Sequence, residues 1–311
     1  MGKNSKVRRD AKMKNVKKNQ AQAQAQAQAQ KKQFKGIDSN TISKLRSDYI
    51  NEWNITAKHY YEKGYYKWMS EQISSYKNIL EVGCGNGCST KQLLDDGHFV
   101  ISVDENPKCL DETEKYLVTS GYTVKRIDRE KILIPEHLSY QIEYSDIQEI
   151  QGDFDVILIN GDISHDPKLY KFLHSYNIDA IVCWLIGSHG TRILNKSVIE
   201  SGCTHNAAHY RILTQNRVYE VADEILKKDG ILHIIDRGAE LDDQQLNATI
   251  QCHNEQASVT KLLVQQDSIK SLPYEEPTSE NKMQMITTNQ ATGEVIQRND
   301  RYFHSIKSIM P

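Results

Sequence analysis

The most informative segment of the sequence is Ile79-Leu80-Glu81-Val82-Gly83-Cys84-Gly85-Asn86-Gly87. An apolar run ends in an acidic residue, three glycines follow at every second position, and a helical pattern begins at Ser89. This order predicts a strand, a tight glycine turn and a helix N-terminus. Glycine lets the backbone approach a ligand that a Cβ would exclude, and the helix start adds free N–H donors. We therefore expect a ligand site at this turn.

The spacing of the glycines distinguishes between two classes of cofactor. The dinucleotide fingerprint is Gly-x-Gly-x-x-Gly, and Cys88 stands where its third glycine would be. The glycines alternate instead, as Gly83, Gly85 and Gly87, and Glu81 precedes them. This pattern resembles the first motif of class I S-adenosylmethionine (SAM)-dependent methyltransferases, Glu/Asp-x-Gly-x-Gly-x-Gly.

Polar residues at the ends of the next predicted strands extend the resemblance. The run from His98 ends at Asp104, which lies 21 residues after Gly83. At that distance a carboxylate at the next strand tip bonds ribose hydroxyls. Two further runs, residues 141–145 and 154–159, end at Asp146 and Asn160.

The resemblance covers roughly residues 50–240 and implies roles for individual residues. Asp146 would reach the adenine amino group with Ile147 stacking nearby, and strand 154–160 would be the family's fourth strand. Polar Asn160, at that strand tip, would bond cofactor or acceptor. The cofactor-binding residues that we expect are Glu81, Gly83, Cys84, Gly85, Gly87, Asp104, Glu105, Asp146, Ile147 and Asn160.

Composition and motifs indicate a cytoplasmic protein. Of the 311 residues 38% are hydrophobic, and mean hydropathy is −0.63. The longest apolar run, residues 180–186, falls far short of the ~18 residues of a membrane helix, so no membrane association is expected. The basic N-terminus lacks the apolar region of a secretory signal. Six scattered cysteines without a C-x-x-C pair favour reduced thiols.

The first 36 residues differ sharply in charge from the rest of the chain. They hold 11 Lys/Arg and one acid, whereas the remainder holds 28 Lys/Arg and 40 Asp/Glu. Five Ala-Gln dipeptides occupy residues 21–30 and offer no apolar face to bury. We predict a mobile basic tail. Residues 3–35 either bind RNA phosphates or serve as a nonspecific solubilising segment.

Alternating strand and helix patterns predict an α/β fold. We expect a doubly wound, mostly parallel sheet of the seven-stranded type with helices on both faces. A helical cap over 37–75 would follow the tail at 1–36 and precede a SAM-binding core at 76–240. Residues 241–311 would add a C-terminal helix and antiparallel strands, with a hairpin over 283–297. The long connection 186–214 would lie beside the methyl group and select the acceptor.

Methyl transfer from a sulfonium depends largely on alignment, and a base is needed only when the acceptor must lose a proton. His165 and His189 follow predicted strands on the cleft side, and histidine titrates near neutral pH. Tyr60 lies in an aromatic segment that, in the family, folds over the cationic cofactor. The alternatives are loop histidines with structural hydrogen bonds and a tyrosine of the core. These three residues are the catalytic candidates.

The predicted function is SAM-dependent methyl transfer to a small or medium-sized acceptor by in-line displacement. Asn160-Gly161-Asp162-Ile163 lacks the Asn/Asp-Pro-Pro-aromatic motif of amino-methylating DNA enzymes, which disfavours that activity. One alternative is an RNA or ribonucleoprotein methyltransferase tethered by the tail. Another is a non-catalytic SAM-binding sensor or assembly subunit. Cys203, His205 and His209 supply only three local ligands, so no metal is expected.

Overall fold

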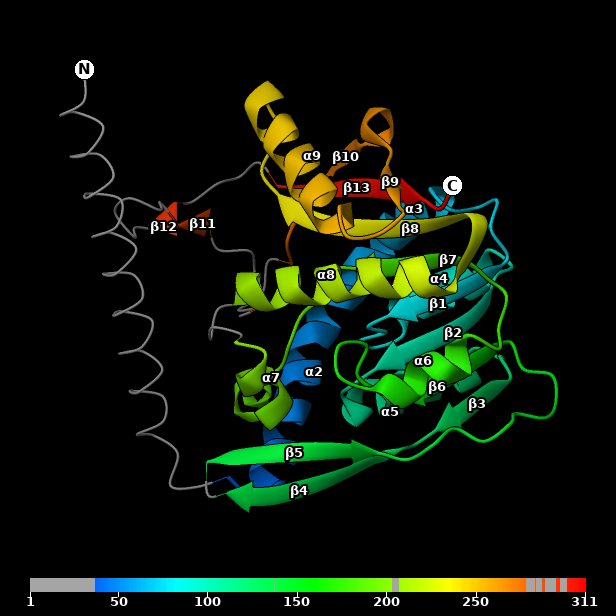
Figure 1. Cartoon of the computed structure of the whole chain (residues 1–311), viewed down its shortest axis with the longest axis vertical. Coiled ribbons are helices and arrows are strands. Elements are labelled where there is room, and N and C mark those ends of the chain that lie inside the picture. The colour runs from blue at the N-terminus through cyan, green and yellow to red at the C-terminus, as the bar shows by residue number, and fades with distance from the viewer. Residues whose placement is uncertain are drawn as a thin grey trace.

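The computed structural model describes residues 37–136, 138–202, 207–277, 283, 287–288, 295–296 and 301–311 (Figure 1). The predicted basic tail at residues 1–36 lies outside this range. Within the described part of the chain, no helix combines the length and the apolar composition needed to cross a membrane.

A mostly parallel sheet forms the centre of the molecule. Its strand order is β10-β13-β8-β7-β1-β2-β6-β3, and β9 pairs with β13. The strands from β3 to β8 in this order run parallel, and β13 is antiparallel to its neighbours. The strands are β1 (Asn78–Val82), β2 (Phe99–Asp104), β3 (Val124–Ile127), β6 (Val156–Asn160), β7 (Ile178–Trp184), β8 (Leu226–Gly238), β9 (Leu263–Val264), β10 (Lys270–Pro273) and β13 (Tyr302–Ile309).

Helices cover both faces of the sheet, which explains why its central strands are apolar on both sides. One hydrophobic core joins the sheet to α2 (Ser39–Glu62), α3 (Tyr65–Glu71), α4 (Cys88–Asp95) and α5 (Pro107–Thr119). A second core joins the opposite face to α6 (Pro167–Leu173), α8 (Ala207–Ile225) and α9 (Asp243–Ala257). The prediction of a doubly wound α/β sheet with helices on both faces is therefore confirmed.

The predicted strand over residues 140–145 is not part of this sheet. It forms β5 (Ser139–Tyr144), which pairs with β4 (Glu130–Glu136) in a separate antiparallel hairpin. The strand at 154–160, expected to be the fourth, is β6, and it pairs with β2 rather than β1. The place beside β1 belongs to β7. The residue patterns give the reason, since β6 is a continuous buried run, whereas β5 alternates as a half-exposed strand does.

The hairpin packs against α2 and against the segment that follows β7. A small hydrophobic cluster joins Ile132, Ile142 and Tyr140 of the hairpin to Ile42 of α2 and Leu194. Leu194 ends the short helix η1 (Gly190–Leu194), which is followed by α7 (Lys196–Glu200). Figure 1 shows the hairpin below the N-terminal end of α2, with α7 beside it.

The C-terminal region contains the predicted helix, α9, and a short 3-10 helix, η2 (Gln266–Ser268). Of the predicted hairpin over 283–297, β11 (Thr287–Thr288) and β12 (Val295–Ile296) pair antiparallel in a sheet of their own. The residues between these two strands lie outside the described range. The antiparallel strand that the central sheet acquires near its edge is β13, which pairs with β8 along its whole length.

Candidate functional site

A pocket lies where the carboxyl ends of β1, β2, β6 and β7 meet, the usual ligand edge of such a sheet. It is a narrow cavity of about 60 Å³ and is partly open to solvent. The strand ends form its floor, and side chains of α2 and α8 form its walls. The lining residues are Val82, Gly83, Gly85, Val103, Asp104, Glu105, Asn106, Gly161, Asp162, Ile163, Trp184, Leu185, Ile186, Gly187, Ser188, His189, Tyr49, Trp53, Tyr210 and Thr214.

The glycine turn forms one end of this floor. Gly85 has a φ of +56°, which disfavours any other residue, and a Cβ there would collide with the indole of Trp53. Its N–H donates to Asp104 Oδ2 at 3.2 Å, so the turn is bonded to the tip of β2. The turn therefore presents backbone to the pocket, as its sequence predicts.

Three of the predicted cofactor residues support the turn from behind instead of lining the pocket. Glu81 is buried and accepts hydrogen bonds from the hydroxyls of Ser89, Thr90 and Ser102. Burial raises the pKa of Glu81, although the three hydroxyls act in the opposite direction. Gly87 precedes α4 in the left-handed conformation, and Cys84 is buried. These residues hold α4 and the turn together.

Asp104 lies in the pocket at the end of β2, as predicted. Its Oδ1 accepts from Asn106 N at 2.9 Å, and its Oδ2 accepts from Gly85 N. Burial raises the pKa of Asp104 to about 7, with Glu105 adding to the rise and the two backbone N–H donors opposing it. This carboxylate is thus costly to ionise until further donors reach it. Ribose hydroxyls would be such donors.

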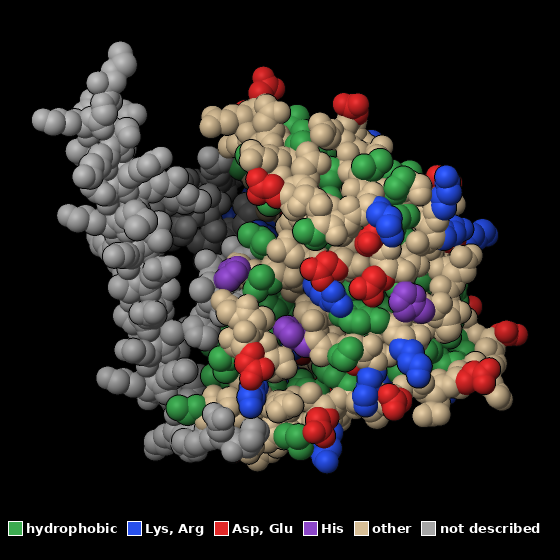
Figure 2. Space-filling model, viewed as in Figure 1, with side chains coloured by type: hydrophobic (Ala, Val, Ile, Leu, Met, Phe, Trp, Pro, Cys, Tyr) green, Lys and Arg blue, Asp and Glu red, His purple; other side chains and the backbone are tan. Residues whose placement is uncertain are grey.

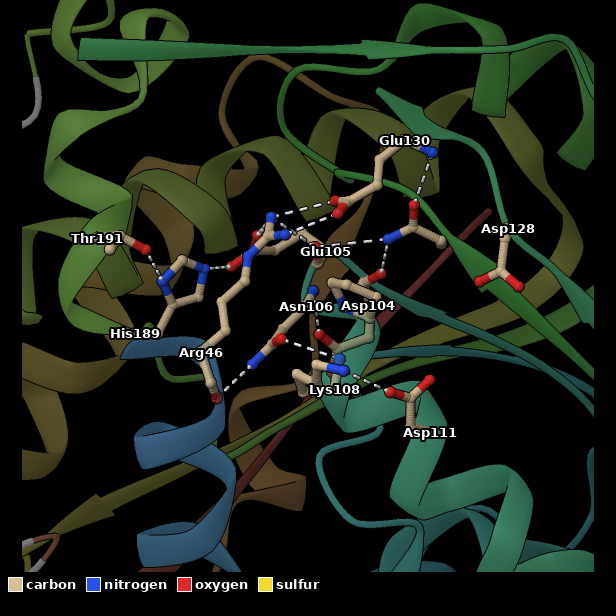
Figure 3. A network of polar contacts seen from close by, with 12 residues as sticks. Arg46, Asp104, Glu105, Asn106, Lys108, Asp111, Asp128, Glu130, His189 and Thr191 are labelled. Atoms are coloured by element: carbon tan, nitrogen blue, oxygen red, sulfur yellow. Dashed lines mark hydrogen bonds and ion pairs between the residues drawn. The ribbon is translucent and has the colours of Figure 1, made fainter. Parts of the chain in front are cut away.

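Glu105 also lines the pocket, but two arginines and a histidine of the protein lie around it, of which Figure 3 shows Arg46 and His189. Its carboxylate oxygens lie 2.8 Å from His189 Nε2, 3.6 Å from Arg192 Nη1 and 3.7 Å from Arg46 Nη2. Burial alone would raise the pKa of Glu105, but these three residues lower it to about 2. Glu105 is therefore a fixed negative charge beside Asp104.

Asn160 braces the floor without lining the pocket. It is fully buried, and its Nδ2 donates to the carbonyls of Asp104 and Glu105, each at 3.5 Å. Its Oδ1 accepts from Glu130 N at 3.0 Å. Asn160 thus ties the tip of β2 to the base of the hairpin.

The structure does not place Asp146 and Ile147 at the pocket. The side chain of Asp146 is 74% exposed and lies 3.6 Å from Lys168 Nζ, while Ile147 packs against the second hydrophobic core. The reason is that β5 pairs with β4 in a separate hairpin and is not a strand of the central sheet. Asp162 and Ile163 occupy the corresponding place, because β6 is the neighbour of β2.

Sequence reasoning missed Asp162, and a signal for it existed. The acid and the apolar residue after it follow the continuous apolar run of β6 within one turn. Asp162 is 4% exposed, and its carboxylate accepts from Ser164 N and Arg192 and lies 3.0 Å from His165 Nδ1. Burial raises the pKa of Asp162, but Arg192 and His165 outweigh it and hold the pKa well below the usual range.

Of the three catalytic candidates, the structure brings His189 to the pocket. Its Nε2 lies 2.8 Å from Glu105 Oε1 and its Nδ1 lies 2.6 Å from Thr191 Oγ1, so both ring nitrogens face polar partners. His165 lines a different pocket, between α7 and α8. Tyr60 is fully buried, stacks edge-on against Phe303 at 5.1 Å and donates its hydroxyl to Glu276.

Aromatic side chains from α2 and α8 reach the pocket as well. Trp53 and Tyr49 cover it from α2, and a Cβ on Gly187 would lie 2.6 Å from the Tyr49 hydroxyl. Tyr210 lines it from α8, beneath the Arg192 guanidinium at 5.7 Å. The aromatic pattern before the glycine turn had indicated such a cover, whereas nothing in the sequence distinguished Tyr210.

Among the described residues, no group of three or more His, Cys, Asp or Glu side chains is arranged to hold a metal ion. Cys203 and His205 of the local histidine–cysteine cluster lie outside the described residues.

No known family model matches the sequence, and no curated protein does so either. Several solved structures align with most of the chain at low identity. Magnesium protoporphyrin IX methyltransferase from Synechocystis PCC 6803 with bound SAM is 7% identical with a TM-score of 0.40, covering 82% of this chain and 80% of that chain. The N-methyltransferase NodS from Bradyrhizobium japonicum is 12% identical with a TM-score of 0.39, covering 81% and 97%. An rRNA methylase from Streptococcus thermophilus is 14% identical with a TM-score of 0.38, covering 79% and 94%. At identities and TM-scores this low, the alignments carry no argument about activity.

Proposed function

We propose that the protein is a SAM-dependent methyltransferase whose donor occupies the pocket at the carboxyl edge of the sheet. The observation that carries the proposal is the bond between the Gly85 N–H and the buried carboxylate of Asp104. This bond joins the alternating glycine turn to the acidic tip of the neighbouring strand. A backbone cradle beside a carboxylate with room for further donors suits a ligand with a narrow chain and hydroxyl groups.

The lining residues divide the donor site into three parts. Backbone of Gly83 and Gly85 would flank the amino-acid chain, and Asp104 would accept hydrogen bonds from the ribose hydroxyls. Asp162 and Ile163, rather than Asp146 and Ile147, would lie beside the adenine. When bound, SAM supplies a methyl group already activated for displacement, so the protein has to align the acceptor and exclude water.

A small or medium-sized acceptor fits this enclosure best. Tyr49 and Trp53 cover the pocket from α2, and the segment with His189 covers it from the other side. The reaction would therefore take place beneath side chains that keep bulk water away. Because both nitrogens of His189 face polar partners, we assign this residue a positioning role and not that of a base.

Methylation of RNA or a ribonucleoprotein is the second candidate, and the charge of residues 1–36 is the observation in its favour. The face of the body shown in Figure 2 does not add to it, since acidic and basic side chains are interspersed there without a continuous basic patch. A non-catalytic SAM sensor is a third candidate. A sensor would bind SAM without transferring its methyl group, which distinguishes it from both enzymes.

Calorimetry with SAM and with S-adenosylhomocysteine tests donor binding, and tritium transfer from labelled SAM into cell extract tests turnover. We expect both ligands to bind and label to enter a small-molecule fraction. Binding of a nicotinamide or a nucleoside triphosphate in place of SAM would overturn the proposal. Deletion of residues 1–36 should leave turnover unchanged, and a loss of RNA labelling on deletion would favour the second candidate.

A further inference from the structure

Three segments wall the pocket over the strand ends. Helix α2 brings Tyr49 and Trp53, α8 brings Tyr210, and the segment that follows β7 brings His189, three residues before Arg192 of η1. The wall formed by α2 and the wall with His189 must both be held against the strand ends for the pocket to have its shape. The contacts that hold them converge on Glu105, which is a further role for a residue of the donor site.

The first set of contacts anchors α2. Arg46 is 2% exposed and donates from Nη1 and Nη2 to Glu130 at 2.7 and 3.1 Å. Its Nη2 also lies 3.5 Å from the carbonyl and 3.7 Å from the carboxylate of Glu105. Arg46 precedes Tyr49 by three residues and Trp53 by seven, so all three share one face of the helix. Fixing the guanidinium therefore fixes both aromatic side chains over the pocket.

The second set anchors the segment with η1. His189 Nε2 lies 2.8 Å from Glu105 Oε1, and Arg192 Nη1 lies 3.6 Å from Oε2. Arg192 is 1% exposed and also donates to Asp162. A single carboxylate thus lies between a cation of α2 and two residues of the opposite wall.

Some polar atoms of these ion pairs have no hydrogen-bond partner. Glu105 Oε2 is buried and has no hydrogen-bond donor among the described residues, although two guanidinium groups flank it. Arg192 Nε and Nη1 also lack acceptors there. Buried polar atoms in this state cost free energy until a partner arrives, so the network is open to a donor brought by a ligand.

We propose that Glu105 is a positioning residue that holds both walls over the donor pocket. The role in donor binding rests on the proposed function, whereas the role in holding the walls concerns the free protein alone. A buried ion pair that only stabilised the fold would join a single pair of residues. Glu105 instead contacts both segments at the edge of the floor, beside the places where Tyr49 meets the His189 ring and Ile42 meets Leu194.

Glu130 provides a matched control. It binds the same guanidinium of Arg46 as Glu105 does, but it neither lines the pocket nor contacts His189 or Arg192. Glu130→Gln removes one charge from the network, as Glu105→Gln does, and both replacements keep the volume of the side chain. We call the contacts of Glu105 with Arg46, His189 and Arg192 the junction. The two variants therefore distinguish the loss of one negative charge beside Arg46 from the loss of the junction.

Hydrogen exchange of the free, full-length protein tests the junction. Glu105→Gln should speed exchange both in residues 39–62 and in residues 189–194, whereas Glu130→Gln should speed it in 39–62 alone. His189→Gln, which keeps an N–H donor, should speed exchange mainly in 189–194 and provides a readout if Glu105→Gln does not fold. Because the His189 ring contacts Tyr49, a smaller effect on α2 is expected as well. Equal exchange patterns for Glu105→Gln and Glu130→Gln, or an effect of His189→Gln on α2 as large as that of Glu105→Gln, would overturn the proposal.

Calorimetry of the same variants tests the consequence for the donor. Glu105→Gln should weaken SAM binding by about tenfold or more, because both walls lose the charged carboxylate that they contact. Glu130→Gln should weaken it less. If the exchange pattern is as expected but wild-type protein does not bind SAM, the junction stands and the proposed function fails. Unchanged affinity in Glu105→Gln, with SAM bound by wild type, would overturn the role in binding.

Discussion

The floor and the walls of the pocket are built in different ways. On the floor, the Gly85–Asp104 bond joins residues 19 apart, and Glu81 reaches hydroxyls 8, 9 and 21 residues away. In the walls, Arg46 contacts Glu105 and Glu130 across 59 and 84 residues. The floor uses backbone groups and hydroxyls of adjacent elements, whereas the walls use buried charges from distant ones.

This difference indicates how substitutions in the floor and in the walls should affect the affinity for the donor. Floor contacts form wherever the strand–turn–helix unit forms, since their partners lie within that unit and the next strand. Wall contacts form only after the hairpin, α2 and η1 have reached the same place, and each buried charge then depends on its partners. We therefore expect floor variants to lower donor affinity most and wall variants to act indirectly.

The largest effect should come from Gly85→Ala. The new Cβ meets the indole of Trp53, and φ at this position is +56°. Relief of the clash displaces the turn or the indole from the pocket, so we expect SAM affinity to fall by about a hundredfold, in addition to a loss of stability. Calorimetry measures the loss. Gly97→Ala is the control, because φ there is +83° but nothing lies within 4 Å of the added Cβ, so stability should fall while affinity persists. Equal affinities for the two variants would contradict the role of the turn.

The next effect should come from Asp104, and it should depend on pH. Burial raises the pKa of Asp104 to about 7 in the free protein, so below that pH the carboxyl is protonated and accepts ribose hydroxyls poorly. SAM affinity should therefore rise with pH up to about 7 and then level off. Asp104→Asn or Asp104→Ala should lower affinity more than about tenfold. In the Asn variant the pH dependence should disappear.

The same pKa shift affects stability with the opposite sign. A carboxyl whose pKa is raised on folding keeps its proton in the folded state while the unfolded chain has lost it. Between pH 3.8 and about 7 this group therefore makes the free protein less stable as pH rises. Thermal unfolding of wild type and Asp104→Asn across this range should differ increasingly toward pH 7. A constant difference would show that Asp104 is already ionised in the free protein.

A smaller loss should follow from Arg46→Met in the wall. The aliphatic side chain keeps the volume of the stem but removes the ion pairs with Glu105 and Glu130, so Tyr49 and Trp53 are held less firmly. We expect SAM affinity to fall by about threefold to tenfold, with a coupling to Glu105→Gln of about 1–2 kcal/mol in a double-mutant cycle. Calorimetry of the four proteins measures the coupling. Additive losses would mean that the two residues do not act through one contact.

The smallest effect should come from Asp146→Ala. The side chain is 74% exposed and lies away from the pocket, so affinity for SAM should be unchanged. Asp162→Asn should lower it, because Asp162 lines the pocket and holds Arg192. A strong effect of Asp146→Ala would place β5 at the donor site after all and contradict the described topology.

The predictions made from sequence succeeded where a motif and its structure occupy the same short segment. Gly83, Gly85 and Asp104 lie where the sequence places them, because a strand end, a turn and the next strand end are local units in a parallel sheet. The prediction that Asp146 lines the pocket failed because the residue pattern of a strand does not indicate which other strands it pairs with. The alternation of β5 and the continuous apolar run of β6 carried the distinction between a hairpin strand and a central strand.

The amino-acid sequence by itself determined the doubly wound α/β class, the glycine turn and the acid at the end of β2, Asp104. These features depend on residue spacing and on backbone geometry that only glycine adopts readily. The tertiary structure alone decided that β6 lies beside β2, that Asp162 reaches the pocket and that Glu105 joins Arg46, His189 and Arg192. Contacts of that kind arise from packing between segments far apart in the chain, and no local pattern of residues encodes which of them will meet.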